Sequence, residues 1–204
     1  PTGATGSRGY ESALGYIFEF FQKIGLKSFY HSYTLYKKKD YGEQEVTVQS
    51  IYKNVVATLQ GKRPERIYLT AHFDTLEFSP GANDNHSGVA VLLELARILS
   101  SLQLNSTITF VAFSGEEDGR LGSKAFTKEI NGVTKGAINI DSVGSGKIQQ
   151  QEVITNLASL VFADELVKII RQRDGSFSPT VYIDRYSCFH SDHESFWDEN
   201  IPAV

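Results

Sequence analysis

Acidic residues and histidines cluster at four places in the chain, and together they could bind a divalent cation. The clusters are His72-Phe73-Asp74, Asn83-Asp84-Asn85-His86-Ser87, Ser114-Gly115-Glu116-Glu117-Asp118 and Asp141-Ser142. No Lys or Arg lies within them, and the nearest following cation is Arg120. Ionised carboxylates gathered without a counter-charge raise one another's pKa and lose hydration, so their convergence would be costly. A divalent cation would neutralise them, and a His among carboxylates suits zinc or a similar borderline ion.

The segments around these clusters indicate why they should meet. Strands are predicted over Arg66–Phe73, Thr107–Phe113 and Gly136–Ile140, and each leads into one of the acidic clusters. The Asn83–Ser87 cluster immediately precedes a predicted helix over Ser87–Leu102. In sheets built from parallel strands, ligands bind outside the carboxyl ends of the strands. We therefore expect all four clusters at one edge of a sheet.

Taken one at a time, these residues also have ordinary structural explanations. Asp74 and Asp141 could cap the turns that follow their strands, and Asp84 could cap the next helix. His72 could be a core histidine with satisfied hydrogen bonds, and Glu116-Glu117 could form a solvated acidic loop. A shared site is favoured because four clusters at one edge are much less expected by chance than a single one.

The remaining segments continue an alternating pattern of helices and strands. Helices are predicted over Tyr10–Gly25, Gly122–Ile130, Leu157–Arg173 and Ser191–Asn200, and strands over Phe29–Tyr36, Glu45–Leu59 and Thr180–Ile183. A hairpin turn is expected at Lys37–Glu43, and Asn200–Val204 reads as the start of a strand. The pattern predicts an α/β fold, a three-layer sandwich whose central sheet is mixed but mostly parallel, with helices on both faces.

Length and composition narrow the function classes. A chain of 204 residues suits a single domain over residues 1–204. With 20 basic and 24 acidic residues the net charge is −4, which argues against a nucleic-acid partner, and no apolar run reaches the ~18 residues needed to cross a membrane. The single cysteine, Cys188, excludes an internal disulfide and a Cys-based zinc site, and we expect it to be a small buried residue. The chain has no Met and ends within a predicted strand, so we expect it to be trimmed.

The four acidic clusters, in the order in which they occur along the chain, resemble the metal-site segments of the co-catalytic zinc aminopeptidases. The matching segments are His72-Phe73-Asp74, Gly81–Ala90, Gly115-Glu116-Glu117 and Asn139-Ile140-Asp141. Outside the site, Gly6-Ser7, Asn54–Ala57, Ser191-Asp192-His193 with Phe196, and Ile201–Ala203 are similar too, so that the resemblance covers nearly the whole chain. This family includes bacterial leucyl aminopeptidases, glutamate carboxypeptidase-like enzymes, glutaminyl cyclases and the transferrin receptor ectodomain.

The resemblance implies two zinc ions that share one bridging water. Asp84 would bind both ions. His72 and Asp141 would complete the first site, and Glu117 would bind the second ion. The family's last ligand, a His on the next loop, would lie beyond Val204, so we expect the second site to be incomplete in this chain.

The resemblance also assigns roles in catalysis. Glu116 would be the general base, taking a proton from the metal-bound water and passing it to the leaving amine. Asp74 would hold the imidazole of His72 in its metal-binding tautomer. His86, His190 and His193 receive no role and are better explained as structural histidines. The implied activity is a zinc-dependent exopeptidase acting on peptides, foremost an aminopeptidase, and the implied location is secreted or periplasmic.

Two other functions on the same fold compete with this one. A non-catalytic receptor or scaffold domain ranks lower, because this chain keeps every ligand that its length can hold. A glutaminyl cyclase-like acyltransferase with a single zinc ranks lower because Asp84-Asn85-His86-Ser87-Gly88 is more similar to the peptidases.

Overall fold

A five-stranded mixed sheet forms the centre of the molecule in the computed structural model, which describes residues 3–40, 45–146, 152–173, 179–184 and 190–204. The strands lie in the order β1-β2-β4-β3-β5. Their bounds are β1 (Lys27–Asp40), β2 (Glu45–Leu59), β3 (Arg63–His72), β4 (Ser106–Phe113) and β5 (Thr134–Asn139). β2 pairs antiparallel with β1 and β4, whereas β3 pairs in parallel with β4 and β5. The predicted mixed sheet is confirmed, but it is not mostly parallel as expected, because β2 pairs antiparallel on both sides and the two kinds of pairing are equally represented among these strands.

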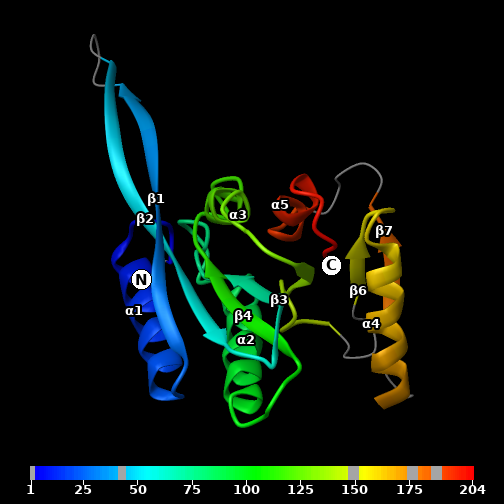
Figure 1. Ribbon diagram of the computed structural model, residues 1–204. Coiled ribbons are helices and arrows are strands. Elements are labelled where there is room, and N and C mark those ends of the chain that lie inside the picture. Colours follow the sequence, from blue (N-terminus) through cyan, green and yellow to red (C-terminus); the bar gives the residue numbers. More distant parts are fainter. Residues whose placement is uncertain (1–2, 41–44, 147–151, 174–178, 185–189) are drawn as a thin grey trace.

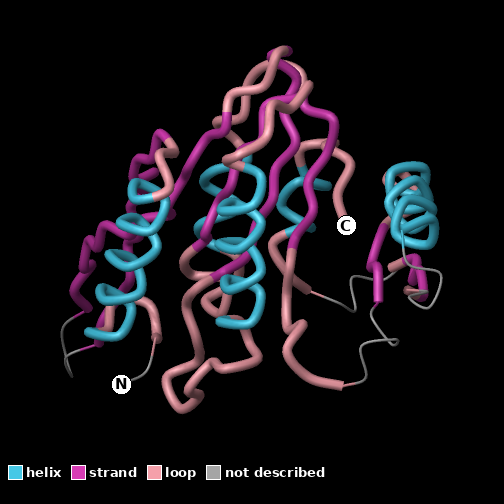
Figure 2. The backbone as a smooth tube through the Cα atoms, turned by 90° about the horizontal axis from the view of Figure 1, so that it is seen from below, coloured by secondary structure: helices cyan, strands magenta, loops and turns pink. Residues whose placement is uncertain are grey.

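Helices cover both faces of this sheet (Figures 1 and 2). On one face lie α1 (Arg8–Lys23) and α2 (His86–Leu99), and on the other lie α3 (Leu121–Thr127) and α5 (His193–Asp198). A smaller parallel sheet of β6 (Glu152–Thr155) and β7 (Thr180–Ile183) packs against α4 (Leu160–Arg173), beside the C-terminal residues. The three-layer α/β architecture is therefore confirmed. Among the described residues, no helix has both the length and the apolar character to cross a membrane.

Apolar residues at helical spacing explain how α1 packs on the sheet. Leu14, Ile17 and Phe21 share one face of this helix and are buried in the core beneath it. The hydroxyl of Ser7 accepts a hydrogen bond from the backbone N–H of Tyr10 and so caps the helix start. The predicted helix over Tyr10–Gly25 is confirmed, with each end displaced by two residues.

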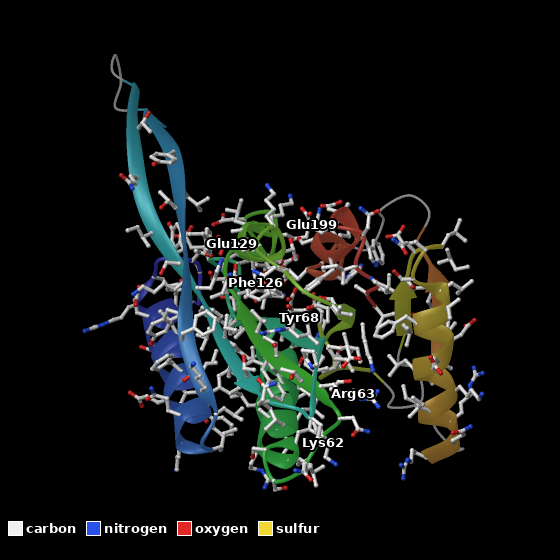
Figure 3. All side chains as sticks on the ribbon, viewed as in Figure 1. Lys62, Arg63, Tyr68, Phe126, Glu129 and Glu199 are labelled. Atoms are coloured by element: carbon white, nitrogen blue, oxygen red, sulfur yellow. The ribbon has the colours of Figure 1, made fainter. Side chains whose placement is uncertain are left out.

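A second core lies between the sheet and the α3–α5 layer. Tyr68 of β3 and Phe126 of α3 face each other there, with ring centroids 5.9 Å apart (Figure 3). Phe196 of α5 also packs on Tyr68, at 5.7 Å between centroids, and is fully buried. Because α3 and α5 are short, these aromatic contacts fix both helices on the sheet at its carboxyl edge.

Three local expectations differ from the structure. The polar run at Lys37–Glu43 was expected to be a turn, but β1 continues to Asp40, because backbone pairing with β2 extends to Glu45 and overrides local turn preference. β6 was not predicted, since four residues are too few to show a period. The expected strand at Asn200–Val204 forms one isolated parallel bridge, between Ala137 and Ala203.

Replacing Phe21 by Ala should lower the free energy of unfolding by about 3–5 kcal/mol, because its ring is fully buried between α1 and the sheet. Tyr16→Ala on the same helix is the matched control, because that side chain is 64% exposed. Its effect should stay within about 0.5 kcal/mol. Urea unfolding measures both, and equal losses for the two variants would contradict this packing.

Candidate metal centre

Three of the predicted ligands converge at the carboxyl edge of the sheet. His72 ends β3, Asp141 lies two residues past β5, and Asp84 lies two residues before α2. The Nε2 atom of His72 is 3.2 Å from Asp84 Oδ1 and 3.6 Å from Asp141 Oδ1. One ligand atom from each residue lies within 4.8 Å of the other two. Three distant parts of the chain thus present a compact set of potential metal ligands.

The environment of His72 tests whether these residues fit a cation. Its Nδ1 atom lies 3.1 Å from the carbonyl oxygen of Asp74, which can only accept, so the ring proton belongs on Nδ1. Nε2 is then an acceptor, and it is buried without a partner in hydrogen-bond geometry among the described residues. An acceptor facing the carboxylates of Asp84 and Asp141 is stable only with a positive charge between them. Neutral imidazole with carboxylates is a donor set that zinc prefers, so the residues fit this ion.

The pKa of His72 expresses the same demand for positive charge. Burial lowers this pKa, but the close approach of the Asp141 and Asp84 carboxylates and the charges of Asp141 and Asp192 outweigh burial and raise it well above its ordinary value. The acidic surroundings therefore favour a cation at this point, whether it is a proton or a metal ion.

Glu116 and Glu117 follow β4 and reach the same edge. Glu116 Oε2 lies 4.0 Å from Nε2 of His72, and burial together with the charge of Asp192 raises the pKa of Glu116 to about 8. Glu117 is not within the compact set of three ligands. Together with Asp84, Glu116 and Asp141 it lines a cleft with a volume of about 640 Å³. Burial, followed by the charge of Asp84, raises the pKa of Glu117.

Asp74 contacts the site through other atoms than expected. Its backbone carbonyl, not its carboxylate, accepts the hydrogen bond from His72 Nδ1. The nearest carboxylate oxygen is 3.8 Å from Nδ1 of His72. The carboxylate instead accepts the backbone N–H groups of Glu116 at 3.2 Å and Glu117 at 3.3 Å, and the Thr5 hydroxyl at 3.2 Å. Asp74 therefore supports both the imidazole and the loop that carries the two glutamates.

A series of side-chain hydrogen bonds holds the carboxylate of Asp141 through its Oδ2 atom. The hydroxyl of Ser191 donates to Asp141 Oδ2 at 2.6 Å, and Asn139 donates to Ser191 at 2.8 Å. Thr70 donates to Asn139 in turn, also at 2.8 Å. Because Oδ2 is occupied, Oδ1 is the oxygen that faces His72. The Ser191-Asp192-His193 segment belongs to the family resemblance in the sequence, but the resemblance does not predict this contact of Ser191 with Asp141.

Asn85 links two ligand-bearing segments and was also missed. Its Oδ1 accepts the backbone N–H groups of Gly88 at 3.0 Å and Ser142 at 3.1 Å, and its Nδ2 donates to the carbonyl of Ile140 at 2.9 Å. A Cβ at Gly88 would lie 2.3 Å from both Asn85 Oδ1 and the Ile140 carbonyl oxygen, so only glycine fits there. The hydrogen bonds of Asn85 to Ile140 and Ser142 set the spacing between Asp84 and Asp141.

The histidines left without a role lie around this site. His190 and His193 line the cleft, and His86 begins α2. Burial, followed by the nearby charge of Arg120, lowers the pKa of His193 to about 4, so its ring is neutral at pH 7. None of the three belongs to the compact ligand set found among the described residues. Cys188 lies outside the described residues.

Comparison with known proteins matches residues 54–204 to the model of peptidase family M28. Aminopeptidase YwaD of Bacillus subtilis is 40% identical over 99 residues, which cover 47% of this chain and 22% of that protein. The matched segment thus spans less than a quarter of this relative's length.

Solved structures give a similar result. The structure of BSAP, a zinc aminopeptidase from Bacillus subtilis, has a TM-score of 0.64 at 29% identity and covers 79% of this chain and 42% of its own. Porphyromonas gingivalis glutaminyl cyclase has a TM-score of 0.73 at 20% identity and covers 100% of this chain and 76% of its own. At that identity the cyclase shares the fold alone.

Replacing Asp141 by Asn should weaken zinc binding by more than about 10-fold, because even changing a residue that only hydrogen-bonds to a zinc ligand costs about 10–100-fold in affinity. Asp164→Asn is the matched control, because this exposed residue lies on α4 away from the ligand set. Competition with a zinc chelator measures both affinities. Unchanged affinity in Asp141→Asn would exclude this carboxylate as a ligand.

Proposed function

This chain belongs to peptidase family M28, and from that membership we propose that residues 1–204 form a catalytic domain of a zinc-dependent exopeptidase, specifically an aminopeptidase. Its substrates would be peptides from which it removes N-terminal residues. The observation that carries the proposal is the convergence of His72, Asp84 and Asp141 beside Glu116. A secreted or periplasmic location belongs to the same proposal.

The proposed ligands divide between two zinc sites. His72 and Asp141 would hold one ion, Glu117 would hold the other, and Asp84 would contact both. Bound zinc would supply a Lewis acid that polarises the scissile carbonyl and lowers the pKa of water. On the protein side, Asp74 keeps the His72 proton on Nδ1, and Ser191 turns one oxygen of Asp141 toward the ligand set.

Glu116 is the proposed general base. It lies at the cleft, close to the ligand set, and its raised pKa shows that its carboxylate is held in a buried, acidic environment. Positive charge at His72 lowers this pKa. Cations held by the proposed ligands would lower it further, so that an ionised Glu116 could accept a proton near neutral pH. Glu116 would take a proton from the attacking water as the C–O bond forms. It would return the proton to the amine nitrogen as the C–N bond breaks.

The lining of the cleft supports an aminopeptidase over a carboxypeptidase. Five acidic residues line it, namely Asp84, Glu116, Glu117, Asp141 and Glu152, and none of the described lining residues is Lys or Arg. With Asp84, Glu117 and Asp141 engaged by zinc, Glu116 and Glu152 would remain to attract the protonated α-amine of a peptide, whereas a C-terminal carboxylate would need a cationic side chain. Apolar residues such as Ile140, Ile154 and Leu166 complete the cleft and could contact a substrate side chain.

Replacing Glu116 by Gln should reduce kcat by about 10²–10⁴-fold on aminoacyl-nitroanilides, because the amide cannot accept the proton. Zinc content should stay at the wild-type level, and Glu165→Gln, an exposed change on α4, should leave both unchanged. A chelator should abolish wild-type hydrolysis, and added zinc should restore it.

Three results would contradict this proposal. Hydrolysis that persists in Glu116→Gln would remove the general base. Hydrolysis that is indifferent to the chelator would remove the metal. Pyroglutamate formation without peptide hydrolysis would assign the site to the cyclase chemistry instead.

A further inference from the structure

The side chain of Asn54 is fully buried in β2 and uses its entire hydrogen-bonding capacity. Its Oδ1 accepts the backbone N–H of Ser114 at 3.0 Å and the Ser114 hydroxyl at 3.3 Å. Its Nδ2 donates to the carbonyl of Gly122 at 2.9 Å and to Nδ1 of His31 at 3.0 Å. An amide has two donor hydrogens and two acceptor lone pairs, so none of them is left unused.

The orientation of this amide is fixed by its partners. A backbone N–H such as that of Ser114 can only donate, so the atom facing it must be oxygen. A backbone carbonyl such as that of Gly122 can only accept, so the atom facing it must be nitrogen. A flipped amide would lose both contacts and leave buried groups unpaired, which makes the bridge between Ser114 and Gly122 specific to Asn.

Ser114 and Gly122 are the two ends of the loop that carries Glu116 and Glu117. The Gly122 N–H also donates to the Ser114 carbonyl at 3.0 Å, so the two ends meet in a narrow neck. A Cβ at Gly122 would lie 2.2 Å from the Ser114 carbonyl oxygen and 2.3 Å from Asn54 Oδ1. The hydroxyl of Tyr33 donates to the same carbonyl at 2.9 Å. The neck is therefore held closed by the Gly122 N–H, by Asn54 and by Tyr33.

Beyond the neck, the loop is held together by its own backbone. The N–H groups of Gly119 and Arg120 both donate to the Glu116 carbonyl at 2.8 Å, and Leu121 N–H donates to the Gly115 carbonyl at 2.8 Å. Such a turn moves as a unit about its two ends. The position of the neck consequently sets the direction in which both glutamate side chains point.

We propose that Asn54 is a positioning residue that closes the neck of the Ser114–Gly122 loop and thereby places Glu116 and Glu117 at the metal centre. Asp74 holds the same loop further along, through the N–H groups of the two glutamates. Asn54 makes no contact with the ligand set and acts through the loop. The effect on turnover rests on the proposed function, whereas the effects on loop order and zinc affinity do not.

The test compares Asn54→Ala with Val55→Ala in this chain. Val55 is the next residue of β2, is equally buried, and packs on the opposite core, so its truncation also creates a cavity. Hydrogen exchange of a peptide covering residues 114–122 reports loop order, chelator competition reports zinc affinity, and steady-state kinetics separate kcat from KM. Asn54→Asp, which keeps the shape but sets an oxygen against the Gly122 carbonyl, serves if Asn54→Ala does not fold.

We expect faster exchange in the loop and zinc affinity lower by about 10–100-fold in the Asn54 variants. Turnover should fall mainly through kcat, since the reacting groups are misplaced. Val55→Ala should lower the unfolding midpoint but keep wild-type hydrogen exchange in residues 114–122 and wild-type zinc affinity. Asn54 variants that match Val55→Ala in both measurements would overturn the proposal.

The proposed function can fail separately. If the wild-type chain hydrolyses no peptide but the Asn54 variants lose loop order and zinc affinity as expected, the positioning role stands and the peptidase assignment falls. If the wild type is active and Asn54→Ala keeps its loop order, zinc affinity and kcat, the peptidase assignment stands and the positioning role falls.

Discussion

The rest of the structure depends on a buried imidazole nitrogen that faces two carboxylates. Nε2 of His72 is shielded from water, and in the neutral ring it carries a lone pair, because the ring proton lies on Nδ1 and is donated to the Asp74 carbonyl. Asp84 and Asp141 stand within 4 Å of it. Water cannot relieve the repulsion of these acceptors at a buried position, so a cation must. The acidic loop beside it makes the same demand, because Glu116 and Glu117 have raised pKa values.

The fold meets this demand by bringing strand ends together and then cross-linking the segments that follow them. β3 pairs in parallel with β4 and β5, which places His72, the glutamate loop and Asp141 at one edge. Buried amides and hydroxyls then fix the spacing: Asn85 joins the segments of Asp84 and Asp141, Ser191 orients Asp141, and Asn54 closes the glutamate loop. Each of these polar groups is itself satisfied, so the cross-links stabilise the site without adding unpaired groups to the core.

The alternation of apolar segments was enough to predict the main helices and strands, with ends that differ by no more than four residues. It also placed His72, Asp84 and Asp141 at one edge, because strand polarity alone decides which ends meet. The side-chain hydrogen bonds that link these segments could not be predicted from the sequence. The contact of Asp74 through its carbonyl depends on the backbone conformation after β3, which side-chain types do not reveal. Asn54 acts on a loop that is 60 or more residues away in the sequence and shares no local pattern with it. The four-residue β6 and the extension of β1 to Asp40 depend on pairing partners, which no local period encodes.

The central claim is that a zinc ion belongs between His72, Asp84 and Asp141. The most direct measurement is anomalous scattering at the zinc absorption edge from crystals of this chain grown with zinc. The account predicts a peak about 2.0–2.1 Å from Nε2 of His72, with an oxygen of Asp84 and one of Asp141 in contact with it. A map with zinc bound elsewhere and no peak beside that nitrogen would contradict it.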